Sequence, residues 1–259
     1  MIFDTHAHYD DEAFDTDREA ILEELAKQEI EYVVDVSSDI DSVDKVIALA
    51  TQYPFIYASV GIHPSETKDL NDERLLWLKE KALHPKTVAI GEIGLDYYWD
   101  TPERLIQKKW FERQIDLARE VRLPLIIHSR DAANDTFGIM KEMRAEELGA
   151  IIHCFGYGTE QARQYLNLGY YLGIGGVVTF TNGRKLKEVV EYAPLEQLVL
   201  ETDCPYLAPV PNRGKRNSSL NLPYVIKEIA KIKQTDYDTV LRITSENAKR
   251  FYRIHSEVR

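Results

Sequence analysis

The sequence predicts an α/β fold in which eight parallel strands and intervening helices close into one TIM-type (β/α)8 barrel, regular or distorted. Short apolar, β-branched runs recur along the whole chain, and amphipathic helical stretches separate them. The runs are continuous rather than alternating, which is typical of parallel strands covered on both faces. The expected strands cover residues 2–5, 32–37, 56–62, 88–93, 124–128, 150–154, 170–174 and 198–201.

Residues typical of helix N-termini support this alternation of strands and helices. Thr16 and Glu19 have the spacing of a capping box, and Thr101 followed by Pro102 predicts an N-cap with proline at the first helical position. Residues 103–121 then form an amphipathic helix, with an apolar face of Leu105, Ile106, Trp110, Leu117 and Val121. An open, doubly wound sheet is the alternative topology.

Composition indicates one soluble domain covering residues 1–259. The chain has 259 residues, 44% of them hydrophobic, and no Gly/Ser-rich linker. It begins without a signal-like segment and contains no run of 18 apolar residues, so we expect neither export nor a membrane partner. Two cysteines fit a reducing cytoplasm, and no obligate protein partner is evident. The net charge of -11 disfavours broad electrostatic binding of nucleic acid.

Uncommon ligand-type residues fall at the carboxyl ends of the expected strands, where barrels of this class build their active sites. His84 and His255 are the histidines that lie elsewhere. The residues at strand ends are His6 and His8 (first strand), His63 (third), Glu92 (fourth), His128 (fifth), His153 (sixth) and Asp203 (after the eighth).

The spacing of His6 and His8 predicts a shared metal ion, because residues i and i+2 of a strand project from one face. Asp4 is placed to orient one of these rings. Two satisfied strand-end histidines would be the simpler interpretation of that motif alone. Glu92 is interpreted as a carboxylate bridging two cations, with flanking glycines leaving room around it; an ion pair with Arg130 is the alternative.

Together His6, His8, Glu92, His128, His153 and Asp203 exceed the needs of one tetrahedral ion, so we expect two divalent metals. Imidazole ligands favour Mn, Zn, Fe or Ni over Ca, and Mg is compatible through the carboxylates. Glu92 and Asp203 are the candidate catalytic residues, with Asp203 as metal ligand and general base for the attacking water. Cys154 and Cys204 are expected to be structural, because Cys154 would face away from His153 on a regular strand.

The segment after Asp203 is long and rich in proline, and it carries Arg213, Lys215 and Arg216. Long loops in compact barrels are usually functional, so these cations are expected above the metals; a solvated charge run is the alternative. Tyr97, Tyr98 and Trp99 follow the strand of Glu92 and are expected either to stack on bases or to pack in the core.

These motifs in this order resemble the TatD family of metal-dependent deoxyribonucleases, within the amidohydrolase-like superfamily. The similarity lies in residues 3–8 (FDTHAH), 61–64 (GIHP), 90–98 (IGEIGLDYY), 128–132 (HSRDA), 153–155 (HCF), 201–209 (ETDCPYLAP) and 247–251 (NAKRF). The resemblance implies a distorted barrel with divalent metals at the six positions above. Where the family commonly has Glu-Pro, this chain has Ser218 and Ser219.

The function expected from the resemblance and the cations is hydrolysis of phosphodiester bonds from a DNA strand end. DNA, as a single strand or a strand end, is then the substrate, held by His63, Arg130, Arg213, Lys215 and Arg216. Hydrolysis of a small amide or ester uses the same chemistry and is the alternative. A metal-binding protein without turnover is disfavoured by Asp203 and by the glycines of the seventh strand, Gly173 to Gly176.

Overall fold

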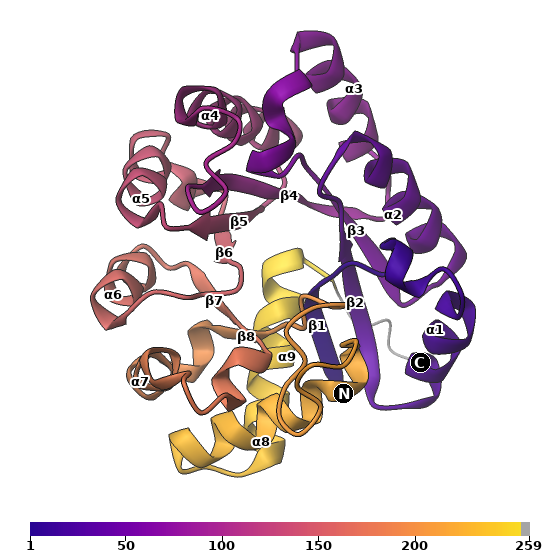
Figure 1. Ribbon diagram of the computed structural model, residues 1–259, viewed down its shortest axis with the longest axis vertical. Coiled ribbons are helices and arrows are strands. Elements are labelled where there is room, and N and C mark those ends of the chain that lie inside the picture. The colour runs from indigo at the N-terminus through magenta and orange to yellow at the C-terminus, as the bar shows by residue number, and fades with distance from the viewer. Residues whose placement is uncertain (255–259) are drawn as a thin grey trace.

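A computed structural model describes residues 1–254. It contains eight parallel strands that pair in chain order, from β1 to β8, with helices packed around them (Figure 1). The prediction of a barrel is confirmed, and the open doubly wound order is excluded. The strands are β1 (Ile2–Ala7), β2 (Ile30–Val36), β3 (Ile56–Val60), β4 (Thr87–Asp96), β5 (Leu125–Arg130), β6 (Ala150–Ile152), β7 (Tyr171–Ile174) and β8 (Leu198–Leu200).

The seam between β8 and β1 is where the barrel departs from regularity. It closes through one bridge, Ala7 to Cys204, and through the amides of Thr202 and Asp203, which donate to the carbonyl of His6. Asp203 is therefore tied to the strand of His6 by its backbone. The seam positions a site residue as well as closing the sheet.

The strand ends differ from expectation by a few residues, and the differences matter for the site. β1 extends to Ala7, so His6 lies within it, and β4 extends to Asp96 because it pairs with β5 as far as Arg130. β6 stops at Ile152, which leaves His153 and Cys154 outside regular strand geometry.

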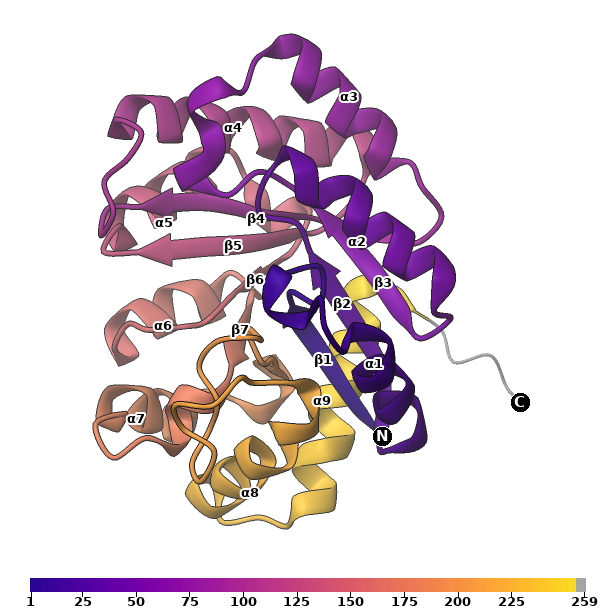
Figure 2. The same ribbon diagram turned by 45° about the vertical axis from the view of Figure 1, so that its right-hand side comes forward.

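Helices follow most strands and cover the outer face of the barrel. α9 lies against β1 and β8 (Figure 1), and Figure 2 also places it apart from the outer α3 and α4 helices. The α-helices are α1 (Arg18–Lys27), α2 (Ile40–Gln52), α3 (Asp72–Ala82), α4 (Arg104–Val121), α5 (Ala133–Glu142), α6 (Thr159–Asn167), α7 (Arg184–Tyr192), α8 (Leu222–Lys233) and α9 (Tyr237–Tyr252). The 3-10 helices are η1 (Glu12–Phe14), η2 (Pro64–Asp69), η3 (Ala145–Glu147), η4 (Gly176–Thr179), η5 (Leu195–Gln197) and η6 (Ser219–Asn221).

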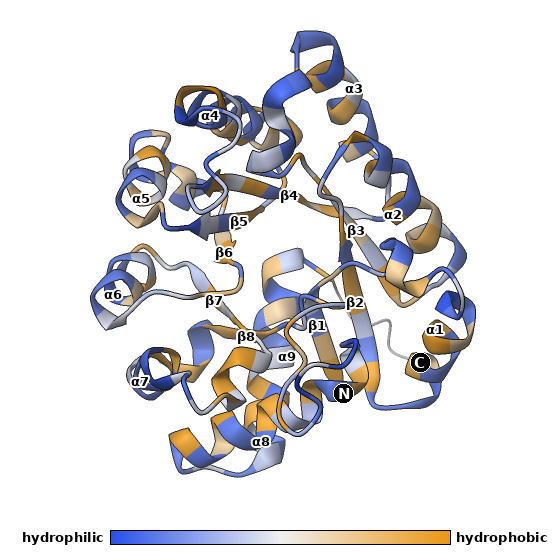
Figure 3. Cartoon of the chain, in the orientation of Figure 1, coloured by the Kyte–Doolittle hydropathy of each residue, from blue (hydrophilic) through white to orange (hydrophobic). Residues whose placement is uncertain are grey.

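The apolar core has two layers because successive strand residues point to opposite sides. One set packs between strands and outer helices, whose exposed faces are hydrophilic (Figure 3). The other set comes from six strands together with the end of α9, which is possible only inside the barrel, and Tyr252 donates to the carbonyl of Thr5. The end of α9 thus packs with the inner apolar layer. In residues 1–254 no helix is long and apolar enough to cross a membrane.

Both expected N-caps are wrong. The N-cap of α1 is Asp17, whose side chain makes no capping bond, because it pairs with Arg216 instead. The N-cap of α4 is Glu103, and Thr101 and Pro102 belong to the preceding loop. Leu105 is 77% exposed rather than on the buried face of α4. The buried side chain of Gln107 explains the late start of this helix, since it bonds the carbonyls of Asp96 and Pro102 and closes the loop.

Candidate metal and catalytic site

Glu92 lies at the centre of the residues that the sequence singled out. Its Oε2 is 3.5 Å from Nε2 of His6 and 4.0 Å from Nε2 of His8, while its Oε1 is 2.6 Å from Nδ1 of His128 and 3.4 Å from Nε2 of His153. Each carboxylate oxygen therefore faces a different pair of imidazoles. Burial opposes ionisation, but the neighbouring His153 and His128 hold the pKa of Glu92 well below its usual range.

His6, His8 and Asp203 form the first side of the site. The two Nε2 atoms of His6 and His8 are 3.1 Å apart, as the i, i+2 spacing predicted. Oδ1 of Asp203 is 3.5 Å from His8 Nε2 and 3.9 Å from His6 Nε2. Nδ1 of His8 is 2.7 Å from the carbonyl of Val36, which orients that ring. Burial disfavours the charged form of His8, yet hydrogen bonding and charge from Asp203, with Glu92, raise its pKa to about 10.

His153 lies between the two sides of the site, its Nε2 3.4 Å from Oε1 of Glu92 and 3.8 Å from Oδ1 of Asp203. It contacts a further carboxylate, which the sequence did not single out. Its ring stacks on His6 with centroids 3.5 Å apart. Its Nδ1 is 3.3 Å from Oε2 of Glu201, whose Oε1 accepts a 2.6 Å bond from the amide of Cys154. Burial lowers the pKa of His153, but Glu201, Glu92 and Asp203 outweigh it and raise the pKa to about 9.

His128 and His63 form the second side. Nε2 of His128 is 3.0 Å from Oδ2 of Asp96, at the end of β4. The rings of His63 and His128 are edge-on with centroids 4.3 Å apart, and ligand atoms of His63, Glu92 and His128 lie within 4.8 Å of one another. Burial, aided by the neighbouring His128, lowers the pKa of His63 to about 3. His63 is thus placed to be either a substrate contact or a ligand.

The donor set fits divalent metal ions. Imidazole nitrogens and carboxylate oxygens gather in groups of three around His6 and around Glu92, with ligand atoms no more than 4.8 Å apart within each group. The Nε2 atoms of His6 and His8 face each other 3.1 Å apart, with carboxylates beside them. Two neutral imidazoles in this arrangement can both donate a lone pair to one cation.

Asp96 and Glu201 are the residues that sequence reasoning missed. Asp96 follows Glu92 by four positions on one strand, so both side chains project from the same face, and that spacing could have identified it. Glu201 precedes Asp203 by two positions and offered the same signal. Both carboxylates contact an imidazole nitrogen, which is how proteins commonly orient metal-binding histidines.

Asp4 does not orient a histidine ring, contrary to expectation. Its carboxylate accepts bonds from the amide and hydroxyl of Thr202 and from the hydroxyl of Ser219, at 3.0, 2.7 and 2.7 Å. Burial raises the pKa of Asp4 to about 7, against these hydrogen bonds. Asp4 therefore holds the β8–α8 segment against β1.

Ser218 and Ser219, the departure from the family pattern, are buried residues of that segment. Ser219 also donates its amide to the hydroxyl of Tyr9 at 2.9 Å. Ser219 thus anchors the loop that carries the three cations.

The glycines near Glu92 serve the sheet and not the carboxylate. A Cβ at Gly91 would lie 2.5 Å from Cβ of Ile126, and one at Gly94, where φ is +145°, would overlap the carbonyl of His128. These glycines allow β4 to approach β5 closely. On β7, a Cβ at Gly173 would overlap the Glu201 carboxylate, so the space beside this glycine is occupied by Glu201.

The expectation that Cys154 faces away from the site is wrong. Cys154 has a φ of 44°, beyond the end of β6, and its Sγ lies within 4.8 Å of ligand atoms of His153 and Asp203. Burial, with the surrounding carboxylates, raises its thiol pKa well above the usual range. A protonated thiol is a poor nucleophile, so a cysteine nucleophile is disfavoured for this reason and not for its orientation.

The expected cations do not act as a group. Arg216 bonds both carboxylate oxygens of Asp17 and the carbonyl of Ala13, and it lies over the ring of Phe14. The guanidinium of Arg213 lies 4.3 Å from the centroid of Phe180, and Lys215 is exposed.

Arg130, for which a pair with Glu92 was the alternative, lies instead 3.8 Å from the centroid of Tyr98. Among the ion pairs of residues 1–254, none joins Arg130 to Glu92.

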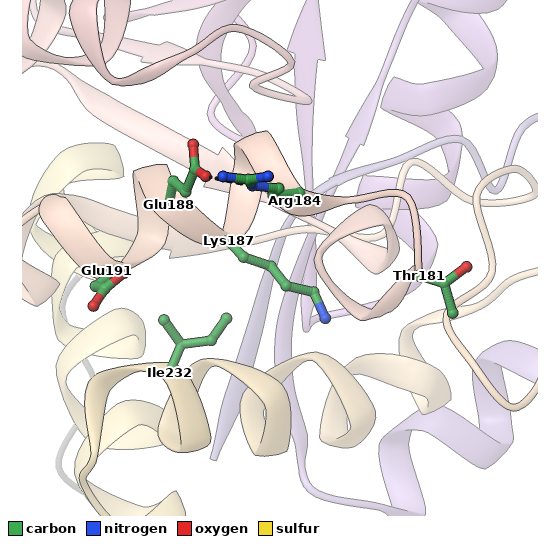
Figure 4. A pocket seen from close by; sticks show the side chains of 6 residues that line it. All are labelled: Thr181, Arg184, Lys187, Glu188, Glu191 and Ile232. Carbon is green, nitrogen blue, oxygen red and sulfur yellow. Dashed lines mark hydrogen bonds and ion pairs between the residues drawn. The ribbon is translucent and has the colours of Figure 1, made fainter.

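A separate hollow of about 500 Å³ lies outside the barrel, between α7 and α8 (Figure 4). Its two cations are already paired: Arg184 with Glu188, and Lys187 with Glu228. It contains none of the strand-end residues, so we place no chemistry there.

An eight-stranded barrel with histidines and carboxylates gathered at the carboxyl ends of its strands defines the class of metal-dependent barrel hydrolases. Residues 3–253 match the family model described as TatD related DNase. The chain therefore belongs to the TatD family of metal-dependent hydrolases.

Relatives over the full length agree. The chain is 46% identical over 255 residues to the uncharacterized metal-dependent hydrolase YabD of Bacillus subtilis, covering 98% of this chain and 100% of YabD. It is 36% identical to the uncharacterized metal-dependent hydrolase TatD of Mycobacterium tuberculosis, covering 96% and 97%. The crystal structure of YjjV, a TatD homolog of Escherichia coli, superposes with a TM-score of 0.91 at 29% identity, covering 98% of each chain.

Proposed function

We propose that this protein is a deoxyribonuclease that cleaves phosphodiester bonds from the end of a DNA strand. The observation that carries the proposal is the position of Glu92, whose two oxygens each face a separate pair of imidazoles. A carboxylate so placed suits a bridge between two cations, the arrangement that supports in-line displacement at phosphorus. The match to the family described as TatD related DNase supports DNA as the substrate.

We assign one ion to His6, His8 and Asp203, a second to His128 and His153, and Glu92 to both; Mg, Mn or Zn would suit these donors. When bound, such ions would polarise the phosphodiester and promote ionisation of water. His8 is oriented for its role by Val36, and His153 by Glu201.

Asp203 is the residue that we assign to proton transfer. Its side chain is 20% exposed, whereas that of Glu92 is 5% exposed, so Asp203 is the more accessible carboxylate. Burial raises the pKa of Asp203, but His153, His8 and His6 outweigh it and keep the pKa below its usual range. The ionised carboxylate can accept the proton of the attacking water.

Substrate contacts are assigned to His63, Arg130, Arg213 and Lys215. Arg216 is left out, because its guanidinium is paired with Asp17. If Arg213 and Lys215 each neutralise one phosphate of a single strand, the salt slope of binding is about -1.4, from roughly 0.7 per phosphate. A shallow slope suits a strand end held locally by an acidic protein.

The test is hydrolysis of single-stranded DNA, duplex DNA, a simple phosphodiester and a carboxylic ester or amide by protein of measured metal content. We expect cleavage of DNA from its ends. Glu92→Gln should lower that activity by at least 10²-fold, because the amide cannot bridge two cations in the same way. His84→Ala removes a histidine outside the cluster and serves as the control.

Hydrolysis of the ester or amide without cleavage of any DNA would refute the nuclease proposal and favour a small-molecule hydrolase. Full activity of Glu92→Gln at wild-type metal content would refute the bridging role.

A further inference from the structure

The loop between β4 and α4 carries two large, exposed aromatic rings and follows the strand of Glu92. We propose that Trp99, supported by Tyr98 and Arg130, is a subsite that binds a nucleobase of the DNA strand by stacking. This inference rests on the proposed nuclease function and adds to it the group that is recognised beyond the phosphate.

Trp99 is the most exposed aromatic side chain of residues 1–254, and Tyr98 is among the most exposed, together with Tyr206 and Tyr192. Trp99 is 64% exposed and Tyr98 55%, whereas Trp110 on the adjoining α4 is 4% exposed. The rings of Tyr98 and Trp99 contact each other edge-on, with centroids 5.1 Å apart. Two adjacent aromatic side chains exposed on one loop form an apolar surface, and such surfaces commonly mark binding sites.

Asp96 connects this loop to the cluster. Its Oδ1 accepts bonds from the amides of Tyr98 and Trp99 at 2.9 and 3.0 Å, and its Oδ2 is 3.0 Å from Nε2 of His128. One carboxylate therefore holds both the backbone of the aromatic pair and an imidazole of the site. The backbone of Tyr98 and Trp99 is thereby joined to His128 through one side chain.

Gln107 makes the loop rigid as well as close. From α4 it accepts the amide of Asp96 at 2.9 Å and donates to the carbonyls of Asp96 and Pro102 at 3.1 and 2.9 Å. Both ends of the loop are thereby fixed by one buried side chain. A preorganised platform loses less conformational entropy when a ligand binds.

Arg130 indicates the kind of ligand. Arg130 lies on β5, the strand that also carries His128. Its guanidinium is 3.8 Å from the ring centroid of Tyr98. Tyr98 thus has two partners already, while Trp99 has only the edge of Tyr98 among the ring contacts of residues 1–254. An exposed indole beside a tyrosine that itself contacts a cation suits a base attached to a phosphate.

Tyr97 does not belong to this subsite, although the sequence grouped the three residues. Its hydroxyl donates to Asp135 at 2.6 Å, and the guanidinium of Arg104 lies 4.1 Å from its ring centroid. Both its hydroxyl and its ring therefore already have partners within the protein.

The test compares two phosphorothioate oligomers of equal length, which resist hydrolysis: oligothymidylate and its abasic counterpart. Each is titrated into metal-loaded protein. We expect wild type to bind oligothymidylate more tightly, with quenching of tryptophan fluorescence. Trp99→Ala should weaken binding of oligothymidylate by about 5- to 150-fold, the range for one base–aromatic stack, and leave the abasic oligomer unchanged.

Trp99→Phe should keep most of the preference for bases and lose the quenching. Tyr192→Ala removes an aromatic ring that is 50% exposed on α7 and should change nothing. The subsite would be overturned if Trp99→Ala lost the same affinity for both oligomers. It would also be overturned if wild-type protein that cleaves DNA bound both oligomers equally well. Binding of bases through Trp99 by a protein that cleaves no DNA would support the subsite and refute the nuclease proposal.

Discussion

Replacing Gly173 with alanine tests how Glu201 supports the site. The added methyl group on β7 would overlap Oε2 of Glu201 and lie 2.6 Å from its Cδ. Glu201 is 1% exposed and accepts the amide of Cys154 at 2.6 Å, so its carboxylate has little freedom to move. Either the strand or the carboxylate must shift.

Both responses have a similar cost. A backbone shift in a packed interior costs about 1 to 3 kcal/mol. Moving the carboxylate gives up a hydrogen bond to a charged group, worth about 1.5 to 3 kcal/mol. We therefore expect the free energy of unfolding to fall by about 1 to 3 kcal/mol. Because His153 also loses its partner, metal affinity should fall about 10- to 100-fold.

The assays are urea unfolding and competition for metal with a chromophoric chelator. Gly138→Ala is the matched control, because Gly138 lies within α5 with no atom within 4 Å of its added Cβ. That variant should gain up to about 1 kcal/mol from helix propensity. If Gly173→Ala unfolds and binds metal as wild type does, Glu201 is not held as we describe.

Three other variants test separate parts of the structure. Asp203→Asn should lose about 10² to 10⁴ in kcat at saturating metal while retaining some bound metal; near wild-type kcat would remove Asp203 from proton transfer. Tyr9→Phe should lower the free energy of unfolding by about 1 to 3 kcal/mol in urea, because the buried amide of Ser219 loses its acceptor; an unchanged midpoint would contradict this. Asp17→Asn should speed hydrogen exchange in residues 205–217, since Arg216 loses its ion pair; unaltered exchange would show that the loop is held elsewhere.

The Asp17 contact also has a defined pH dependence. The hydrogen bond from Arg216 lowers the pKa of the Asp17 carboxyl below its ordinary value of 3.8. A lowered pKa means that the contact is complete above this ordinary value and is lost as the pH falls through the lower folded value. Hydrogen exchange in residues 205–217 of the wild type, after correction for its intrinsic pH dependence, should therefore approach that of Asp17→Asn only in acid.

The sequence alone determined the eight strands, their order along the chain and, apart from Asp96 and Glu201, the ligand-type residues at their carboxyl ends. Continuous β-branched runs mark strands buried on both faces, and parallel strands in one barrel end on the same side. The convergence of His6, His8, His128 and His153 on Glu92 followed from those two facts. The first fact is a local property of the chain, and the second is a general rule of barrel architecture.

Only the tertiary structure decided how each side chain is used. Arg216 was expected over the metals, but it pairs with Asp17, which lies about two hundred positions earlier. Cys154 was expected to face away, but a φ of 44° beyond β6 turns it toward His153. Glu201 takes the room that Gly173 leaves. Periodicity predicts direction within an element, whereas partners from distant segments and backbone angles past a strand end arise when the whole chain packs.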